Sequence, residues 1–454
     1  MEGFIKDIYK KSPVWLQNVI ISGYGYKIHK ERYGEVYFNT YNGLISKDFT
    51  DFSKEIKNQE IELSAFLKHV VSNSTFYKEL YSDIDIESIK TVNDLQILPI
   101  VDKELLRENI EKVYTINEND GVVSYTGGTT GKSLKVIFTK DDFQKRMAYL
   151  DAFKHRIGIT DPFHSRKATF SGRDFIHSDT TNIFWRYNRA YRQRLYSTFH
   201  LSEQNMSFYV DNLNTFKPEI LNGFVSAIYE LSEFIDRKQL QLAFIPKAIF
   251  TTSETLLPHH RELIEKVFKS KIYNQYASAE GAPFITECIK GNLHYNIDTG
   301  VIETLDTDYG SQMIVTSFST KGTPLVRYNI GDTITFKDGG CSCGSSHPLV
   351  LKIEGRKVDY LYSIEKGKIS LSHLADVIKG IPNSIKKMQF VQKSKDVIDI
   401  LIVVDSARYN SEHHDSILKE MEYRFGKQMT VNIEEVDEIP REKSGKFSLI
   451  KNYL

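Results

Sequence analysis

The sequence predicts an α/β protein with a large N-terminal domain of mostly parallel sheets flanked by helices, a small β subdomain, and a small α+β C-terminal domain. Three observations support this prediction. The first 120 residues have mainly helical character, short apolar runs alternate with helix-like runs from 121 to about 280, and the pattern changes again after about 358. Strands that alternate with helices favour parallel sheets with covered faces. A chain of 454 residues has room for two or three such domains.

The predicted elements follow in order along the chain. Apolar residues recur at three- and four-residue spacing over 61–81, which predicts a helix. Alternating elements come next, with strands at 134–139, 219–222, 248–252 and 271–276 and helices at 141–156, 224–238 and 258–268. Strand and turn patterns then predict a mostly antiparallel β region, with strands at 313–318, 324–327, 333–336 and 349–353. The run 185–194 interleaves basic and aromatic residues, which favours a solvated helix face over an anion-binding surface.

The tail of the chain predicts a separate compact unit. Its pattern indicates helices at 371–380 and 411–426 and strands at 387–392, 397–404 and 429–436. We therefore expect an N-terminal domain over residues 1–357 and a C-terminal domain over residues 358–454.

The composition excludes several classes of protein. Lys and Arg number 59 and Asp and Glu number 59, so the whole-chain charge gives no reason to expect a nucleic-acid partner. Hydrophobic residues at 41% and charged residues at 26% are typical of a globular domain rather than a disordered or collagen-like chain. Three cysteines are too few for a disulfide framework and suit a reducing compartment. Because no secretory signal and no spanning segment of about 20 apolar residues is visible, we expect a cytoplasmic protein without a membrane span.

A run rich in glycine and threonine between two predicted strands is the most informative segment. It reads Ser124-Tyr125-Thr126-Gly127-Gly128-Thr129-Thr130-Gly131-Lys132-Ser133. Glycines allow backbone N–H groups to approach an anion, while hydroxyl groups and Lys132 add donors and positive charge. The run is not a Walker loop, because Thr126 stands where that pattern needs glycine and a strand follows instead of a helix. A hairpin turn is the alternative, but the crowding of glycine and threonine favours a phosphate-binding loop.

Five segments, in order, resemble the signature elements of the adenylate-forming superfamily, which includes acyl- and aryl-CoA synthetases, peptide-synthetase adenylation domains and luciferases. The glycine loop is the first of them. The others are Tyr276-Ala277-Ser278-Ala279-Glu280, with alanine in place of the family's glycine, then Arg327-Tyr328-Asn329-Ile330-Gly331-Asp332, Gly355-Arg356, and Pro440-Arg441-Glu442-Lys443-Ser444-Gly445-Lys446. Further similarity lies in Ser12-Pro13, Leu16-Gln17, Ser22 and Gly25, in Lys217-Pro218-Glu219-Ile220-Leu221-Asn222-Gly223, and in a cysteine-rich insert. By these segments the chain most resembles, within the superfamily, the phenylacetate–CoA ligase-like branch, especially its CapK-like members of capsule biosynthesis.

The resemblance implies an AMP-forming carboxylate ligase. Such an enzyme uses ATP and Mg²⁺ to convert a carboxylic acid to an acyl-adenylate with release of pyrophosphate, and then transfers the acyl group to CoA or another acceptor. By family position Glu280 would bind Mg²⁺ with help from Thr129, Asp332 would bind the ribose hydroxyls, and Lys446 would reach the α-phosphate and the substrate carboxylate. Further nucleotide-binding candidates are Ser124, Thr126, Gly127, Gly128, Thr130, Gly131, Lys132, Tyr276, Ala277, Ser278 and Arg356.

The catalytic lysine and the glycine loop fall in different predicted domains. A single active site must therefore close by domain movement, so the resemblance implies a mobile C-terminal domain. The family hinge residue, often Asp or Lys, would be Val358 here, and this departure leaves the pivot open. Several residues can share the change in backbone angles, so rotation remains compatible with the sequence.

Family position also points to an acyl pocket. Aromatic residues among its members suggest a flat or ring-bearing acid, although aromatic positions are more often part of a core. The acid, the acceptor and the oligomeric state remain open. A carrier-protein thiol or a sugar amine or hydroxyl could replace CoA, and a non-catalytic adenylate-binding or scaffold protein could use the same fold. The pocket candidates are Phe170, Asn222, Gly223, Phe224, Ser253 and Ser278.

All three cysteines could serve one metal site. Cys288 and His294 have Cys-x₅-His spacing, and Cys341 and Cys343 follow about 50 residues later. Three thiolates and one imidazole complete a tetrahedral Zn²⁺ shell, which would be structural because no position stays open for water. His347 competes with His294 as the fourth ligand, and three unrelated thiols are the alternative to a metal site.

Overall fold

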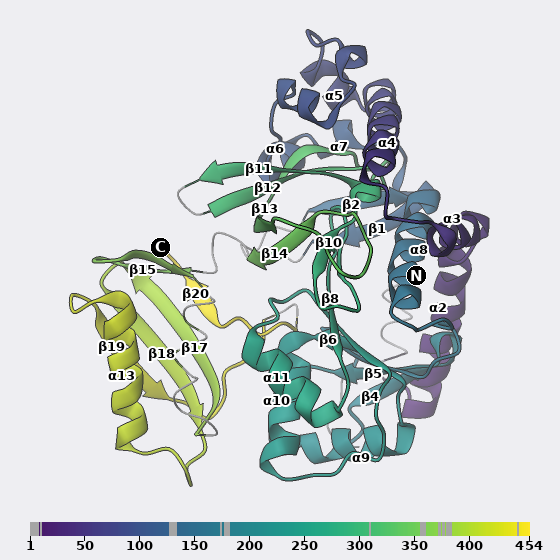
Figure 1. Ribbon diagram of the computed structural model, residues 1–454. Coiled ribbons are helices and arrows are strands. Elements are labelled where there is room, and N and C mark those ends of the chain that lie inside the picture. Colours follow the sequence, from purple (N-terminus) through teal and green to yellow (C-terminus); the bar gives the residue numbers. More distant parts are fainter. Residues whose placement is uncertain are drawn as a thin grey trace.

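The computed structural model describes most of the chain. Figure 1 shows a large N-terminal part with a small C-terminal domain beside it, which confirms the predicted α/β class. The predicted boundary at 357–358, Arg356 and Val358 all lie outside the described residues, so the boundary and the hinge stay predictions. The described residues are 9, 11–126, 134–172, 175–176, 182–307, 310–354, 360–370, 374, 377, 384–442 and 445–454.

The N-terminal region is helical, as predicted. Its longest helix is α4 (Phe52–Asn73), which begins where Asp51 accepts a hydrogen bond from the Lys54 N–H and buries apolar side chains at helical spacing, among them Leu63 and Val70. The other α-helices before the first strand are α2 (Val14–Arg32), α3 (Glu35–Ser46), α5 (Thr75–Leu80), α6 (Lys103–Glu108) and α7 (Ile110–Val113).

One twelve-stranded sheet runs through the large domain. Its parallel part contains β3 (Lys167–Ser171), β5 (Gln193–Ser197), β6 (Ile220–Phe224), β7 (Ala248–Thr252) and β8 (Ile272–Tyr276) in the spatial order β5-β3-β6-β7-β8, with β4 (Trp185–Asn188) antiparallel at the edge. The helices between these strands are α9 (Met206–Phe216), α10 (Val225–Arg237) and α11 (Pro258–Phe268).

The predicted β region is antiparallel but not a separate sheet. It joins the parallel part where β8 pairs with β9 (Ile285–Glu287), so one sheet continues from the parallel strands into this region, although the two parts have separate hydrophobic core clusters. The remaining strands are β10 (Leu293–Tyr295), β11 (Gly300–Thr307), β12 (Gly310–Ser317), β13 (Leu325–Lys337) and β14 (Leu349–Glu354).

A two-stranded hairpin carries the predicted phosphate-binding loop. Strands β1 (Gly121–Tyr125) and β2 (Lys135–Thr139) are antiparallel, with Ser124 opposite Val136. The helix α8 (Lys140–Arg156) follows β2 directly, and its first turn is capped by the Thr139 side chain.

The prediction for the run 185–194 was wrong. The run forms β4, a 3-10 turn and β5 instead of a helix. Arg186 is buried and donates to the Gln17 side chain of α2, while Arg194 donates to Asn212 Oδ1 over 2.8 Å. These arginines therefore serve packing between segments that are far apart in the sequence.

The C-terminal domain has its own sheet and core. The sheet has the order β19 (Thr430–Glu435), β18 (Val397–Val404), β17 (Ile385–Ser394) and β20 (Ile450–Asn452), and β15 (Tyr360–Ser363) and β16 (Gly367–Ser370) form a hairpin. Helix α13 (Ser411–Phe425) buries Ile417, Met421 and Phe425, which are spaced four residues apart. The predicted helix at 371–380 lies almost entirely outside the described residues.

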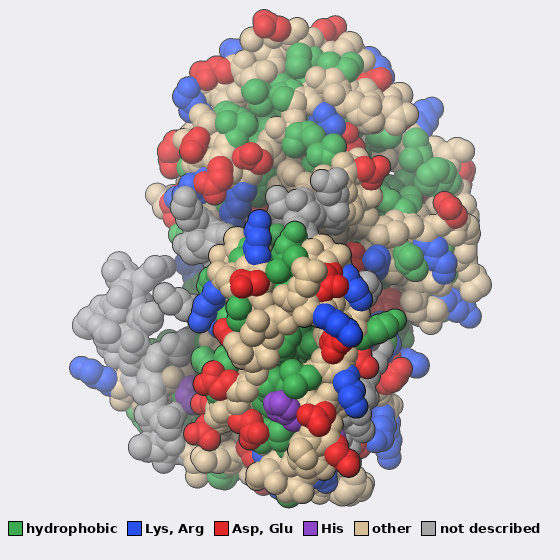
Figure 2. Space-filling model, turned by 90° about the vertical axis from the view of Figure 1, so that its left-hand side faces the viewer, with side chains coloured by type: hydrophobic (Ala, Val, Ile, Leu, Met, Phe, Trp, Pro, Cys, Tyr) green, Lys and Arg blue, Asp and Glu red, His purple; other side chains and the backbone are tan. Residues whose placement is uncertain are grey.

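The surface gives two further observations. Within the described ranges, the structure has no helix whose length and hydropathy would let it span a bilayer. On the face drawn in Figure 2, acidic and basic side chains are interspersed, in keeping with the formal net charge of zero.

Candidate active site and cysteine–histidine cluster

The ends of the glycine loop are held together, while its centre lies outside the described residues. Residues Gly127, Gly128, Thr129, Thr130, Gly131 and Lys132 all fall in that undescribed part. At the base, the Thr126 N–H donates to the Leu134 carbonyl over 3.0 Å, and the Leu134 N–H donates to Thr126 Oγ1 over 2.8 Å. Thr126 is buried and Ser124 lies in β1, so the loop starts from a rigid hairpin base.

Lys103 joins this base, although nothing in the sequence marked it as a candidate. It is the first residue of α6, where the Asp102 side chain caps the helix, and its Nζ donates to Thr126 Oγ1 over 3.3 Å. The preceding Val101 bridges to β13, because the Asn329 N–H donates to the Val101 carbonyl over 2.8 Å. A single lysine in a charged helix is usually solvated, so only the fold reveals this position.

The Glu280 turn packs against the same hairpin. Glu280 is buried, and the Ser278 Oγ accepts hydrogen bonds from the N–H groups of Gly281 and Ala282 at 3.1 and 3.0 Å. Gly281 has a φ of +104°, and a Cβ at this position would clash with Phe138 of β2. This close approach brings the turn that carries Glu280 next to the strand that leaves the glycine loop.

A short hydrogen bond links two of the signature elements. The Tyr276 hydroxyl, at the end of β8, donates to Asp332 Oδ2 over 2.6 Å. Asp332 follows Gly331, whose φ of +85° turns β13 at this point. The structure therefore brings together Tyr276, Ala277 and Asp332, three of the residues predicted to bind the nucleotide.

The acyl-pocket candidates gather at the carboxyl edge of the parallel strands. Phe170 pairs with Gly223 and Phe224 with Thr252 in neighbouring parallel strands, and Ser253 follows β7 directly. Parallel strands place their carboxyl ends at one edge, where α/β proteins commonly bind ligands. Asn222 is half-buried, and Phe224 is 7% exposed.

Phe170 belongs to the core. Its ring is fully buried and stacks on Tyr196 with centroids 4.9 Å apart and an interplanar angle of 13°. The sequence had left open that aromatic pocket candidates belong to the core, and this holds for Phe170. Its ring packs under the carboxyl edge of the sheet and offers no surface to a ligand.

Lys446 of the C-terminal domain lies at this same edge. Its Nζ is 5.9 Å from the centre of the Phe224 ring. On either side, the Thr198 hydroxyl donates to the Gly445 carbonyl, and the Phe447 N–H donates to Glu254 Oε1, each over 3.3 Å. The structure therefore holds the predicted catalytic lysine against the predicted acyl pocket.

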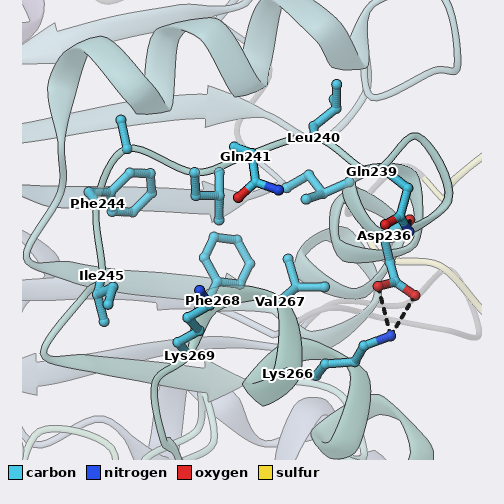
Figure 3. Close-up of a pocket in the computed structure, with 13 residues that line it drawn as sticks. Asp236, Gln239, Leu240, Gln241, Phe244, Ile245, Lys266, Val267, Phe268 and Lys269 are labelled. Atoms are coloured by element: carbon cyan, nitrogen blue, oxygen red, sulfur yellow. Dashed lines mark hydrogen bonds and ion pairs between the residues drawn. The ribbon is translucent and has the colours of Figure 1, made fainter.

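A pocket elsewhere in the same domain is distinct from this edge. Figure 3 shows it between the last turns of α10 and α11, with the Lys266 Nζ 2.8 Å from Asp236 Oδ1. Because α10 begins directly after β6, its last turn lies at the opposite, amino edge of the strands. The pocket is lined by residues 235–236, 239–245 and 266–269.

Cys288, His294, Cys341 and Cys343 form one cluster. Their ligand atoms all lie within 4.8 Å of one another, with Cys288 Sγ 3.7 Å from Cys341 Sγ and Cys343 Sγ 3.5 Å from His294 Nε2. Tetrahedral Zn²⁺ with bonds of about 2.3 Å to sulfur and about 2.0–2.1 Å to nitrogen implies separations of about 3.8 Å between sulfurs and about 3.6 Å between sulfur and nitrogen. The donor set and its spacing therefore fit zinc.

The two candidate histidines have different positions. His294 Nδ1 lies 3.1 Å from the His347 carbonyl, and a proton donated there leaves Nε2 free to face the thiols. Burial also lowers the pKa of His294, which favours the neutral imidazole that metals bind. The His347 ring instead faces Glu55, with Nε2 3.8 Å from Oε2, so His347 contributes its backbone to the site and not its ring.

Comparisons with known proteins identify the family. The CapK C-terminal domain family matches residues 361–453. The CapK protein of Staphylococcus aureus is 33% identical over 444 residues, which cover 97% of each chain, and a phenylacetate-coenzyme A ligase of Thermus thermophilus is 22% identical over 75% of this chain and 79% of its own. The crystal structure of a 2-hydroxyisobutyryl-CoA ligase in the postadenylation state, in complex with R3-HIB-AMP, matches with a TM-score of 0.69 at 15% identity. The match covers 89% of this chain and 91% of that chain, so the two proteins share a fold. The chain belongs to the CapK family, a branch of the adenylate-forming superfamily.

Proposed function

We propose that the protein is an AMP-forming carboxylate ligase. It would activate an aromatic or other small carboxylic acid with ATP and Mg²⁺, release pyrophosphate, and transfer the acyl group to CoA or another acceptor. The observation that carries this proposal is the approach of Lys446 to Phe224 at the carboxyl edge of the parallel sheet. A protein that only binds nucleotide has no use for a lysine carried by a second domain to this edge.

The reaction must bring a carboxylate and a triphosphate together and stabilise negative charge on the α-phosphate. Fixed positive groups and correct orientation supply most of what such a step needs. The ammonium group of Lys446 would lie between the two anions. Its half-buried position would strengthen this interaction relative to bulk water.

The nucleotide would span three elements. The glycine loop would hold the β- and γ-phosphates on a base formed by Thr126 and Lys103, whose hydrogen bond supports this arrangement. Asp332 would accept hydrogen bonds from the ribose hydroxyls, and the Tyr276 hydroxyl would fix its carboxylate orientation. Glu280 would hold Mg²⁺, which supplies charge neutralisation at the phosphates when bound.

The acceptor has two alternatives. Similarity to a phenylacetate-coenzyme A ligase favours CoA. The resemblance to CapK-like members of capsule biosynthesis favours instead a carrier-protein thiol or a sugar amine or hydroxyl as the acceptor. Product analysis with each acceptor would separate them once the acid is known.

The cysteine–histidine cluster would hold a structural Zn²⁺. Cys288 lies just after β9 and His294 in β10, while Cys341 and Cys343 lie in the connection between β13 and β14. A closed shell of four protein ligands would clamp these two connections together without providing a water nucleophile.

Pyrophosphate exchange with labelled ATP across a panel of carboxylic acids tests the proposal. At least one acid should support exchange, and Lys446→Ala should lower its rate by at least about 100-fold while nucleotide binding persists. Lys419→Ala is the matched control, because Lys419 is an exposed lysine on α13 of the same domain. Exchange with no acid would favour the non-catalytic adenylate binder, and a wild-type rate in Lys446→Ala would remove Lys446 from the reaction.

A further inference from the structure

A buried carboxylate on α10 receives two cations from the C-terminal domain. Glu230 is 7% exposed, and its Oε1 lies 2.7 Å from Arg441 Nη2. Its other oxygen, Oε2, lies 3.2 Å from Lys387 Nζ on β17. The Arg441 and Lys387 side chains are only 5% and 16% exposed, so the three charged groups meet in an interface that largely excludes water.

A second set of hydrogen bonds extends this contact. Arg441 Nη1 donates to Ser226 Oγ over 3.0 Å, and Ser226 in turn donates to both oxygens of Glu254, from its N–H over 2.7 Å and from its hydroxyl over 3.0 Å. Ser226 and Glu230 are four residues apart and so lie on one face of α10. Glu254 also accepts the Phe447 N–H, so the network ends beside Lys446.

The geometry ties this network to the candidate site. α10 begins directly after Phe224, the residue whose ring faces Lys446. Arg441 and Lys446 are also linked by hydrogen bonds between described residues: the Glu442 N–H donates to the Lys446 carbonyl over 3.0 Å, and Arg441 Nη1 donates to the Gly445 carbonyl over 3.3 Å. A displacement of Arg441 therefore displaces Lys446.

We propose that Glu230 is a positioning residue that, through Arg441 and Lys387, docks the C-terminal domain so that Lys446 stays at the carboxyl edge of the sheet. The proposal deepens the proposed function, because it names what holds the catalytic lysine for adenylation. Any rotation that carries Lys446 away breaks both ion pairs and returns all three charges to water. Glu230 thus favours the docked arrangement selectively, without contacting the reacting atoms.

The variant Glu230→Gln tests this assignment. It removes the carboxylate charge that pairs directly with Arg441 and Lys387 in the docked arrangement, whereas both cations regain water when the domain moves away, so docking is weakened. Glu265→Gln is the matched control. Glu265 on α11 also pairs with one arginine and one lysine, Arg261 at 3.4 Å and Lys271 at 2.9 Å, but both partners belong to the large domain.

Hydrogen exchange of the full chain, without substrates, measures docking directly. In Glu230→Gln, deuterium uptake by peptides covering 439–449 should accelerate by at least about tenfold, and Lys387→Met should give a smaller change of the same sign. In Glu265→Gln, uptake by these peptides should stay within about twofold of the wild type. Unchanged uptake in both interface variants, or equal acceleration in the control, would overturn the proposal.

A kinetic measurement separates positioning from general stability. With an acid that supports pyrophosphate exchange, Glu230→Gln should lower the exchange kcat by about tenfold, while the Kd for ATP stays within about twofold. Acyl transfer from added acyl-adenylate should not fall. Loss of ATP binding in parallel with kcat would contradict a positioning role. The hydrogen-exchange measurement does not depend on ligase activity. Absence of ligase activity in the wild type would therefore refute the proposed function without contradicting the docking role of Glu230.

Discussion

Replacing Gly445 by alanine should push the C-terminal domain off the candidate site. Gly445 has a φ of +76°, and a Cβ built there would lie 2.3 Å from the Gly172 Cα and 2.9 Å from Thr198 Oγ1. Ordinary van der Waals contact begins at 3.4 Å. The Gly172 contact is with backbone, which cannot change rotamer to make room. Gly445, and Lys446 next to it, must therefore move away by roughly 1 Å, the difference between 3.4 Å and 2.3 Å.

The size of the effect follows from the contacts that such a retreat would break. The hydrogen bonds from Thr198 to Gly445 and from Phe447 to Glu254 are both 3.3 Å long, so 1 Å more takes them beyond hydrogen-bond range. At about 1 kcal/mol each, their loss lowers the equilibrium constant for docking by about 30-fold. Misplacement of a catalytic group by about 1 Å can cost about 100-fold in rate. We therefore expect a 30- to 100-fold loss of exchange rate.

The assay is pyrophosphate exchange, and a second glycine supplies the control. Gly367 in the β15–β16 hairpin has a φ of +72°, and no atom lies within 4 Å of a Cβ built there. Gly367→Ala thus carries the same left-handed strain in the same domain without obstructing docking. A pyrophosphate exchange rate in Gly445→Ala within about threefold of the rate in Gly367→Ala would refute the reasoning, because the contact with Gly172 would then not affect docking.

Three further predictions concern the metal, the nucleotide and the pH dependence of stability. Elemental analysis should find about one zinc per chain, and Cys341→Ser should lose this zinc and lower the Tm by on the order of 5 °C. Ser342→Ala, at an exposed neighbouring residue, should change neither the zinc content nor the Tm. A Cys341→Ser protein that keeps both its metal and its Tm would contradict the zinc site. Lys103→Met should raise the KM for ATP by about tenfold, because it removes the donor at the base of the glycine loop, and an unaltered ATP titration would exclude Lys103 from the site. Burial, and then the charge of Glu230, raise the pKa of Glu233 to about 8 from a usual 4.5, so the folded state holds this proton more tightly and the free energy of unfolding should fall as pH rises between these values. Glu233→Gln should flatten that slope in Tm measurements from pH 5 to 9, and parallel curves for both proteins would contradict it.

Local pattern determined much of the fold. Helices α8, α10 and α11 and strands β6, β7 and β8 lie within two residues of the sequence-based predictions, because each shows apolar periodicity or a short apolar run that needs no distant partner. The strands β3, β4 and β5 escaped prediction. Arg186 of β4 and Arg194 of β5 resemble a solvated surface in the sequence, because their partners, Gln17 of α2 and Asn212 of α9, lie far away in the chain or on another element.

The residues of the candidate sites were likewise predictable only in part from the sequence. By itself the sequence determined the family, the order of its signature elements, and a set of thiols and imidazoles suited to zinc, since these are properties of residue type and spacing. Only the tertiary structure decided that His294 and not His347 faces the thiols, that Lys103 reaches Thr126, and that Glu230 meets Arg441 and Lys387 across the domain interface. Lys103 and Thr126 are 23 residues apart and Glu230 and Arg441 are 211 residues apart, and no local pattern encodes the distance between such segments. That distance is set by how the sheets and the hydrophobic cores pack.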